Sequence, residues 1–170
     1  MPSRGVGIDS GARAQHPPQT MLRIHGTCVA LSGLGVLLRG PSGSGKSDLA
    51  LRLIDGGAKL VSDDQVELTL DAAGRVMARA PKALAGLLEV RGIGILRMNA
   101  VRTAPVGLVA DLTPDQQVER LPEAEHCVLL DRPIRRVALA PFNDSTPAKL
   151  RLAASMLSAG SLVPVPDPSS

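Results

Sequence analysis

The sequence predicts an α/β fold: a P-loop-containing mixed β-sheet flanked by helices. A glycine-rich loop at 40–47, "GPSGSGKS", stands between an apolar segment and a helical one, which is the setting of a P-loop. Many short apolar segments elsewhere are typical of strands, and only two segments have helical spacing. Because strands outnumber helices in this way, an evenly alternating parallel βαβ sheet is not expected.

Length and composition predict a single domain. The 170 residues are 44% hydrophobic, enough for one globular core. That core must be aliphatic, because the chain has one Phe and no Trp or Tyr. Residues 1–20 and 163–170 are poor in apolar side chains or rich in proline, so we expect two flexible tails around a P-loop domain at 21–162.

Charge and cysteine usage argue against several classes of partner. The net charge is +3, and Arg135–Arg136 is the only adjacent pair of basic residues. With almost no aromatic rings for base stacking, we expect no nucleic-acid partner. No apolar segment approaches the ~18 residues of a membrane span, so no membrane partner is expected either. Cys28 and Cys127 form no C-x-x-C pair, which predicts two buried thiols in a cytoplasmic protein.

The first half of the chain predicts a strand hairpin, a helix and a further strand. Apolar segments at 21–31 and 34–40 flank Ser32–Gly33, which favours a hairpin. The segment 47–57 has helical spacing and ends at a glycine pair. The segment 58–64, "AKLVSDD", reads as a short buried strand that ends on two acidic residues.

The second half predicts more strands and one more helix. Residues 66–80 alternate around an Ala-Ala-Gly turn, and 87–96, "LLEVRGIGIL", reads as a strand interrupted by two glycines. Three further strands are expected at 106–112, 126–130 and 135–141. The last helix, 146–160, has Ser145 or Thr146 as cap, Pro147 in its first turn and Gly160 as stop.

The loop at 40–47 fits G-x-x-x-x-G-K-[ST] at every fixed position. Glycines let backbone N–H groups surround a phosphate, and the following helix adds its N-terminal partial charge. In this motif the lysine bridges two phosphates and the hydroxyl ligates Mg²⁺. The predicted phosphate-binding residues are Gly40, Pro41, Ser42, Gly43, Ser44, Gly45, Lys46 and Ser47. No N-K-x-D follows, so a GTPase is not expected.

Several ionisable residues could complete such a site. Asp63 and Asp64 end a predicted strand, where a carboxylate could hold Mg²⁺ or take a proton from an attacking hydroxyl; a solvated acidic turn is the alternative. His25, considered by itself, is more typical of a structural residue. Glu89 and Arg91, two positions apart, would share one face of a strand and serve either chemistry or a simple ion pair.

Taken together, "RIHGTCV", "GPSGSGKSDLALRLIDGGAKLVSDDQVEL" and "LEVRGIGIL" resemble the catalytic C-terminal domain of bacterial HPr kinase/phosphorylase. The Asp63–Asp64 pair with Val66 and Glu67, and the E-x-R-G-x-G-I stretch at 89–95, carry the resemblance, which extends over 22–157. It implies a short, single-domain form with the fold shared by HPr kinases and PEP carboxykinases. It also implies ATP-dependent phosphorylation of a serine on HPr, the phosphocarrier of the sugar phosphotransferase system, and phosphorolysis in reverse.

The resemblance also implies roles for individual residues. His25 would orient the catalytic acid, Lys46 would bind phosphate, and Ser47 and Glu89 would belong to the Mg²⁺ site. The Asp63–Asp64 pair would supply the general base, with Asp64 favoured. Arg91 lies in the same signature, and Arg120, in "QVERLP", would be a late catalytic arginine. ATP and Mg²⁺ are therefore the expected cofactors, and HPr the expected partner.

The chain departs from the family at one loop. The family's P-x-R-P-G-R-N segment should fall at "APFNDSTPAK", which keeps only Pro141 and Asn143. That loop is implicated in phosphorolysis and in subunit contacts, so phosphorolysis and a homo-oligomer are expected less firmly than kinase activity. A small-molecule phosphotransferase and a nucleotide-sensing module remain the alternatives.

Overall fold

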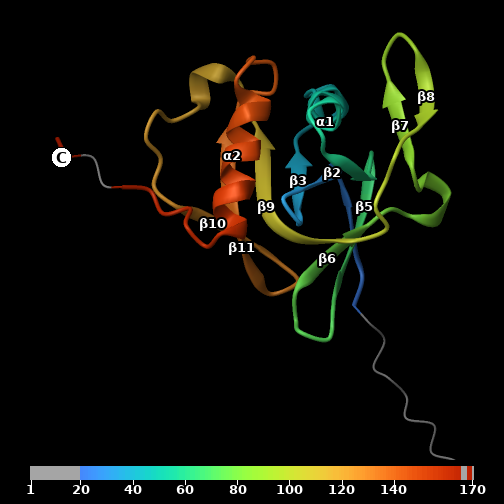
Figure 1. Ribbon diagram of the computed structural model, residues 1–170, viewed down its shortest axis with the longest axis horizontal. Helices are drawn as coiled ribbons and strands as arrows, with labels where there is room; N and C mark the ends of the chain where they lie inside the picture. Colours follow the sequence, from blue (N-terminus) through green and yellow to red (C-terminus); the bar gives the residue numbers. More distant parts are fainter. Residues whose placement is uncertain (1–19, 166–167, 170) are drawn as a thin grey trace, which may run out of the picture.

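The computed structural model describes residues 20–165 and 168–169. The predicted N-terminal tail therefore lies, but for Thr20, outside the described residues. Of the predicted C-terminal tail, 163–165 and 168–169 are described, and they contain no helix or strand. Figure 1 shows the course of the chain.

The described residues form eleven strands, two α-helices and two short 3-10 helices. The strands are β1 (Leu22–His25), β2 (Thr27–Leu31), β3 (Leu34–Arg39), β4 (Lys59–Ser62), β5 (Gln65–Leu70), β6 (Val76–Arg79), β7 (Leu87–Val90), β8 (Gly94–Arg97), β9 (Ala104–Leu112), β10 (Glu125–Leu129) and β11 (Arg132–Leu139). The helices are α1 (Lys46–Asp55) and α2 (Thr146–Ser158), and the 3-10 helices are Lys82–Leu84 and Asp115–Gln117.

The main part of the sheet has the strand order β4–β2–β3–β9–β11–β10. β3 and β11 are both parallel to β9, whereas β2 is antiparallel to both β3 and β4. As a result β4, β3, β9 and β11 run in the same direction and end at the same edge. In open α/β sheets, ligands bind outside the carboxyl ends of such strands.

A second layer of strands covers one face of this sheet. β1, β5 and β6 pair antiparallel in that order, and β6 joins the first residues of β9. The β7–β8 hairpin stands apart as a two-stranded sheet and projects beyond α1 in Figure 1. The site edge therefore has helices on one side and this hairpin on the other.

The core lies on both faces of the sheet because side chains alternate along each strand. On β3, Val36 and Leu38 pack with Leu49, Leu53 and Leu150 of the two helices. Leu37, between them, packs on the opposite face with residues of β5 and β6. The core is aliphatic throughout, as the composition predicts. Cys28 lies fully buried in it as a free thiol, and burial raises the pKa of this thiol to about 12.

Most predicted elements are confirmed. Both helices form where predicted, although α1 begins one residue earlier, at Lys46. Ser32–Gly33 joins β2 to β3 with positive φ angles at both residues. Ser145 takes the N-cap position of α2, but its side chain makes no capping hydrogen bond.

Two predictions about strands are wrong. Residues 21–31 are not one strand: they divide at Gly26 into β1, which pairs with β5, and β2, which pairs with β3 and β4. Residues 87–96 are not one interrupted strand either. They form the β7–β8 hairpin, whose turn contains Gly92 in a left-handed conformation.

Candidate active site

The glycine-rich loop joins the end of β3 to the start of α1, at the edge where the codirectional strands end. Ser44 N–H donates to the carbonyl of Pro41 at 3.0 Å, which closes a tight turn inside the loop. Gly45 has a φ of 94°, and a Cβ there would lie 2.8 Å from the ring of Phe142. Only glycine fits this position. The first N–H groups of α1 are thereby turned toward the loop, as anion binding requires.

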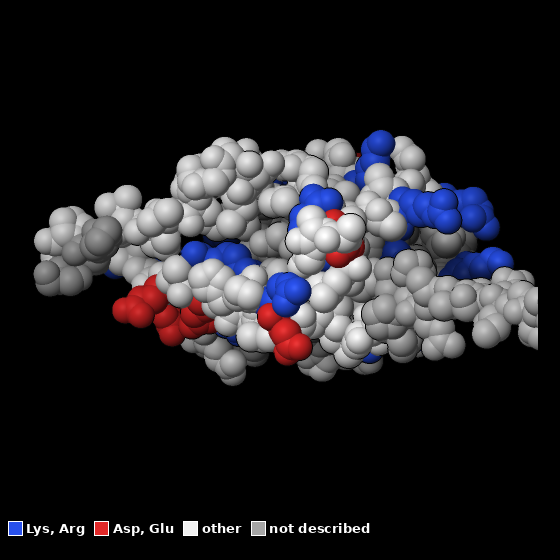
Figure 2. All heavy atoms as spheres, turned by 90° about the horizontal axis from the view of Figure 1, so that it is seen from below, with Lys and Arg blue, Asp and Glu red and all other residues white. Residues whose placement is uncertain are grey.

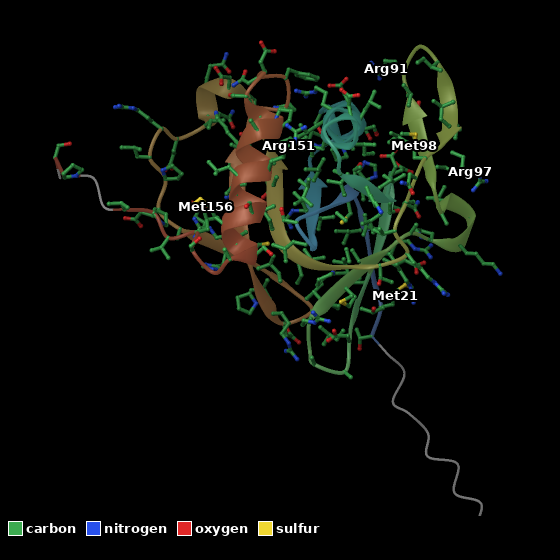
Figure 3. All side chains as sticks on the ribbon, in the orientation of Figure 1. Met21, Arg91, Arg97, Met98, Arg151 and Met156 are labelled. Carbon is green, nitrogen blue, oxygen red and sulfur yellow. The ribbon has the colours of Figure 1, made fainter. Side chains whose placement is uncertain are left out.

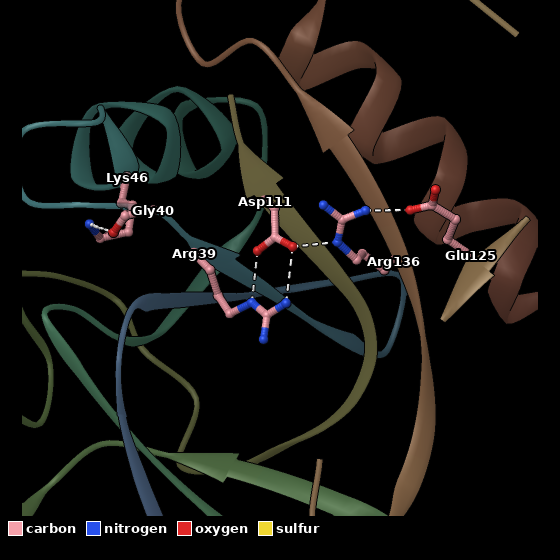
Figure 4. A network of polar contacts seen from close by, with 6 residues as sticks. All are labelled: Arg39, Gly40, Lys46, Asp111, Glu125 and Arg136. Atoms are coloured by element: carbon pink, nitrogen blue, oxygen red, sulfur yellow. Dashed lines mark hydrogen bonds and ion pairs between the residues drawn. The ribbon is translucent and has the colours of Figure 1, made fainter. Parts of the chain in front are cut away.

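Lys46 lies inside the loop and is 7% exposed. Its Nζ donates to the carbonyl oxygens of Gly40 at 2.7 Å and Pro41 at 2.9 Å; Figure 4 includes the contact with Gly40. Burial lowers the pKa of Lys46, and the charges of Asp64 and Asp63 act in the opposite direction. The loop thus holds the ammonium group of Lys46 against its own carbonyl oxygens.

Asp63 follows β4 and is buried against the loop. Its Oδ1 accepts hydrogen bonds from the hydroxyls of Ser47 at 2.8 Å and Thr27 at 2.9 Å. Its Oδ2 accepts from the backbone N–H of Glu89 at 3.3 Å. Because both of its oxygens accept hydrogen bonds, this carboxylate is fixed beside Ser47. It fits the role of a group that orients a hydroxyl or holds a cation.

Asp64 has the opposite surroundings. Its backbone takes a left-handed φ of 69° in the turn between β4 and β5, which directs its side chain away from that of Asp63. The side chain is 63% exposed, and its Oδ1 lies 3.4 Å from Nδ1 of His25 at the end of β1. This carboxylate is therefore accessible to a substrate and has a histidine beside it.

A cavity of about 400 Å³ opens in front of the loop. The predicted site residues that line it are His25, Ser42, Gly43, Gly45, Lys46, Ser47, Asp64, Glu89 and Arg91. The structure brings these residues together from β1, the loop, α1, the β4–β5 turn and the β7–β8 hairpin. Asp63 lies behind the wall, in contact with Ser47.

Two predicted residues need comment. Arg91 does not share a strand face with Glu89, because β7 ends at Val90 and Arg91 is in the turn. Both still line the cavity, and Figure 3 shows Arg91 between the hairpin and α1. Arg120 is exposed between the second 3-10 helix and β10 and does not line the cavity. The structure therefore does not bring Arg120 into this site.

Sequence reasoning missed Phe142, which lines the same cavity and is 66% exposed. It is the only aromatic residue of the chain, a signal that could have drawn attention to it. Asp48, Leu51 and Val90 are further lining residues that the sequence did not indicate.

An ion-pair cluster below the loop was also missed (Figure 4). Arg39, the residue before Gly40, donates to both oxygens of Asp111 at 2.8 and 3.0 Å. Arg136 of β11 contacts Asp111 and Glu125. Burial raises the pKa of Asp111, but the hydrogen bonds and charges of Arg39 and Arg136 outweigh it and lower that pKa overall. The cluster joins the ends of β3, β9 and β11, from which the site loops start.

The metal-binding capacity of the site is limited to scattered oxygen donors. Among the described residues, no group of three or more His, Cys, Asp or Glu side chains is placed to hold a metal ion. Asp63 accepts hydrogen bonds from the hydroxyl of Ser47 and from the backbone N–H of Glu89, which brings these three residues together. In the part of the chain that the structure describes, no helix is long and apolar enough to cross a membrane.

The fold and site define an α/β domain with a mixed sheet, few helices and a glycine-rich loop at the carboxyl edge. The family described as "HPr Serine kinase C-terminal domain" matches residues 19–132. The chain belongs to this family.

Comparison with known proteins agrees with this assignment. Over 147 residues the chain is 42% identical to the HPr kinase/phosphorylase of Leptothrix cholodnii, covering 79% of this chain and 45% of the relative. It is 39% identical over 127 residues to that of a Geobacillus species, covering 68% and 41%. The chain thus spans less than half the length of these relatives.

A solved structure shares the fold. The Hpr(Ser) kinase/phosphatase of Coxiella burnetii superposes with a TM-score of 0.68 at 24% identity, covering 82% of this chain and 89% of the other. The prediction of an α/β fold with a mixed sheet is confirmed.

Proposed function

We propose that this chain is a cytoplasmic, ATP-dependent protein serine kinase that phosphorylates HPr and can run the reaction in reverse. Family membership supports the kind of reaction. One observation about the site carries the proposal: a single turn supplies a buried carboxylate bonded to Ser47 and an exposed carboxylate beside His25. A P-loop kinase needs one acid for the metal-bound phosphates and another for the acceptor hydroxyl.

In the forward reaction, the β-phosphate of ATP binds backbone N–H groups of the loop from Ser42 to Ser47, and Lys46 turns from the loop carbonyls to the phosphates. The hydroxyl oxygen of the acceptor serine forms a bond to the γ-phosphorus while the bond to the bridging oxygen breaks and ADP leaves. Asp64 takes the hydroxyl proton, and His25 holds its carboxylate in place. Arg91 balances charge on the transferred group. Positioning and charge neutralisation supply most of the rate.

The residues around Ser47 fit Mg²⁺. This ion prefers hard oxygen ligands and is usually bound by one or two carboxylates together with substrate phosphates, and Asp63 is a buried carboxylate in contact with Ser47. Ser47, with Asp63 and Glu89 beside it, would hold the ion. When bound, it would neutralise charge on the phosphate oxygens.

In reverse, inorganic phosphate attacks the phosphoserine phosphorus, and pyrophosphate forms. Asp64, now protonated, returns its proton to the departing serine oxygen. Asp64 and His25 thus serve both directions, although phosphorolysis is not the strict reverse of phosphorylation by ATP, because phosphate rather than ADP attacks the phosphoserine. The names of the relatives, which join kinase to phosphorylase, support this direction.

The test is transfer of label from [γ-³²P]ATP to purified HPr by the full chain, with an HPr variant lacking its acceptor serine as control. Label on HPr but not on the control supports the proposal. ATP that is bound but never consumed would point to a nucleotide sensor instead. Consumption only in the presence of a metabolite would point to a small-molecule kinase, and either result would contradict a protein acceptor.

A further inference from the structure

A second cavity lies on the opposite side of the glycine-rich loop. It has a volume of about 320 Å³, within the range of small-molecule sites. Its walls are Pro41 and Ser44 of the loop, residues 112–115 after β9 and residues 140–143 after β11. These three segments all follow strands that run in the same direction, so the cavity is built at the edge where α/β sheets bind ligands.

The walls are mostly flat and apolar, with two polar atoms that have no partner. Pro41, Pro114, Pro141 and Phe142 supply flat surfaces. The hydroxyl oxygens of Ser44 and Thr113 are buried, and within the described residues neither makes a hydrogen bond. Both oxygens are closed off from the cavity, so a ligand would meet mainly the flat apolar walls.

Phe142 connects the two cavities, because it lines both. Its ring lies against Gly45, where an added Cβ would be 2.8 and 2.9 Å from ring atoms. Side chains from other parts of the chain hold the backbone on either side of Phe142 in place. Arg52 of α1 donates to the carbonyls of Pro141 and Asn143, and the Asn143 amide donates to Asp115 at 2.8 Å. The ring is thus presented on a held loop rather than on a free one.

The order of the strands decides which end of a nucleotide would face this cavity. The acidic turn follows β4, two strands from β3 on one side. The second cavity follows β9 and β11, on the other side of β3. A triphosphate in the loop, with its terminal group toward Asp64, would therefore extend its nucleoside toward Phe142.

We propose that the second cavity is the base site of the nucleotide: a purine ring stacks on Phe142 between the proline walls. This inference rests on the proposed function in one respect, namely that the loop holds a nucleoside triphosphate. It adds a residue outside every predicted site position and a reason for the only aromatic ring of the chain. Base–aromatic stacking tolerates different bases, so the ring alone would not select one base.

The test compares a ligand that has a base with one that lacks it. Calorimetric titration measures the Kd of ATP and of pyrophosphate for the wild type and for Phe142→Ala, Thr113→Val and Lys46→Ala. Leu152→Ala is the matched control, because Leu152 is 63% exposed on α2 and lines neither cavity. Phe142→Ala should weaken ATP binding roughly 5- to 100-fold and leave pyrophosphate binding unchanged. Thr113→Val removes a hydroxyl that is closed off from the cavity and should leave the Kd of both ligands unchanged.

A second measurement does not depend on loss of binding. The chain has no Trp or Tyr, so Phe142→Trp introduces a single fluorophore at the proposed stacking position. ATP should change its emission strongly, and pyrophosphate should do so only weakly. Equal responses to the two ligands would overturn the proposal.

The other outcomes separate the two proposals. Equal loss of ATP and pyrophosphate binding in Phe142→Ala would mean that the ring only supports the loop, and would overturn the base site. A raised KM for HPr with unchanged Kd for ATP would assign the ring to the acceptor, and would overturn it too. ATP binding that depends on Lys46 but not on Phe142 removes the base site alone. A wild type that binds neither ligand contradicts the proposed function itself.

Discussion

Asp63 and Asp64 are neighbours in sequence, but the side chain of Asp63 is buried and that of Asp64 is exposed to solvent. Asp63 is 6% exposed and accepts three hydrogen bonds, so its oxygens are occupied. Asp64 is exposed, its Oδ1 lies beside Nδ1 of His25, and its charge acts to raise the pKa of Lys46. A general base must reach the proton that it removes, and a carboxylate already engaged on both oxygens is less suited to this task. The geometry therefore favours different roles for the two.

The first prediction separates these roles. Asp64→Asn should lower kcat for HPr phosphorylation by roughly 10²- to 10⁴-fold, the usual contribution of a general base, with an unchanged Kd for ATP. Asp63→Asn should instead weaken Mg²⁺-dependent ATP binding. It should also lower the free energy of unfolding by about 1–3 kcal/mol, because it disturbs buried hydrogen bonds. Rapid-quench kinetics, calorimetry and urea unfolding measure the three quantities; full activity in Asp64→Asn would exclude it as the base.

At this scale, the sequence indicates the loop residues and the two acids, because their chemistry is carried by residue type and spacing. It does not distinguish Asp63 from Asp64. That difference depends on the left-handed turn and on Thr27 and Glu89, which come from distant elements. A role for Phe142 could not be predicted from the sequence for the same reason: no local pattern indicates that residue 142 lies against residue 45.

Among the elements, the ends of β3, β9 and β11 are joined by the ion-pair cluster centred on Asp111. The pKa of Asp111 is lowered in the folded state: burial raises it, and the hydrogen bonds and charges of Arg39 and Arg136 lower it by more. A group with a lowered folded-state pKa stabilises the fold above its unfolded pKa, about 3.9 for aspartate. This stabilisation is lost as the pH falls through the lower, folded-state value.

We therefore predict that Asp111→Asn lowers the free energy of unfolding at pH 7 by about 1–3 kcal/mol. The difference from the wild type should shrink as the pH falls below about 4, because the carboxylate of the unfolded wild type then binds a proton that the folded state does not yet bind. Urea unfolding at a series of pH values measures both effects. Asp55→Asn, an exposed acid at the end of α1, is the charge-matched control. A constant difference between pH 7 and pH 3 would refute the ion-pair explanation.

Element prediction fails where one apolar segment serves two partners. Residues 87–96 have the composition of a strand, but Gly92 takes a left-handed φ and reverses the chain. Residues 21–31 alternate well enough for one long strand, yet Gly26 lets the two halves pair with different strands. In both cases the glycine is visible in the sequence, while the competing partners are not. The helices are predicted better because their periodicity and end signals are local.

At the scale of the whole molecule, the two cavities lie at one edge of the sheet. Acidic and basic side chains are concentrated at opposite ends of the molecule. In Figure 2, acidic side chains gather near β10 and basic ones at the end that carries β7 and β8. On this face the positive charge does not form the continuous stripe typical of nucleic-acid-binding surfaces. That nucleic acid is not a partner, and that the chain is a homo-oligomer, stay predictions.

Ligand binding at this edge should stabilise the entire domain. By linkage, ATP with Mg²⁺ at about 100 times its Kd adds about 2.7 kcal/mol, which for a domain of this size corresponds to a rise in Tm of roughly 5–10 °C. Lys46→Ala should abolish most of the rise, while Leu152→Ala should keep it. Differential scanning calorimetry measures the effect. An equal rise in Lys46→Ala would mean that ATP binds elsewhere.

The left-handed backbone of Asp64 restricts what can replace this residue. Aspartate, asparagine and glycine tolerate such a φ, whereas longer or branched side chains are strained there. Glutamate could supply the same carboxylate, but it enters the left-handed region less readily than aspartate. The residue at position 64 thus determines both the conformation of the turn and the ability to accept a proton. Asparagine removes the proton acceptor and keeps the conformation of the turn.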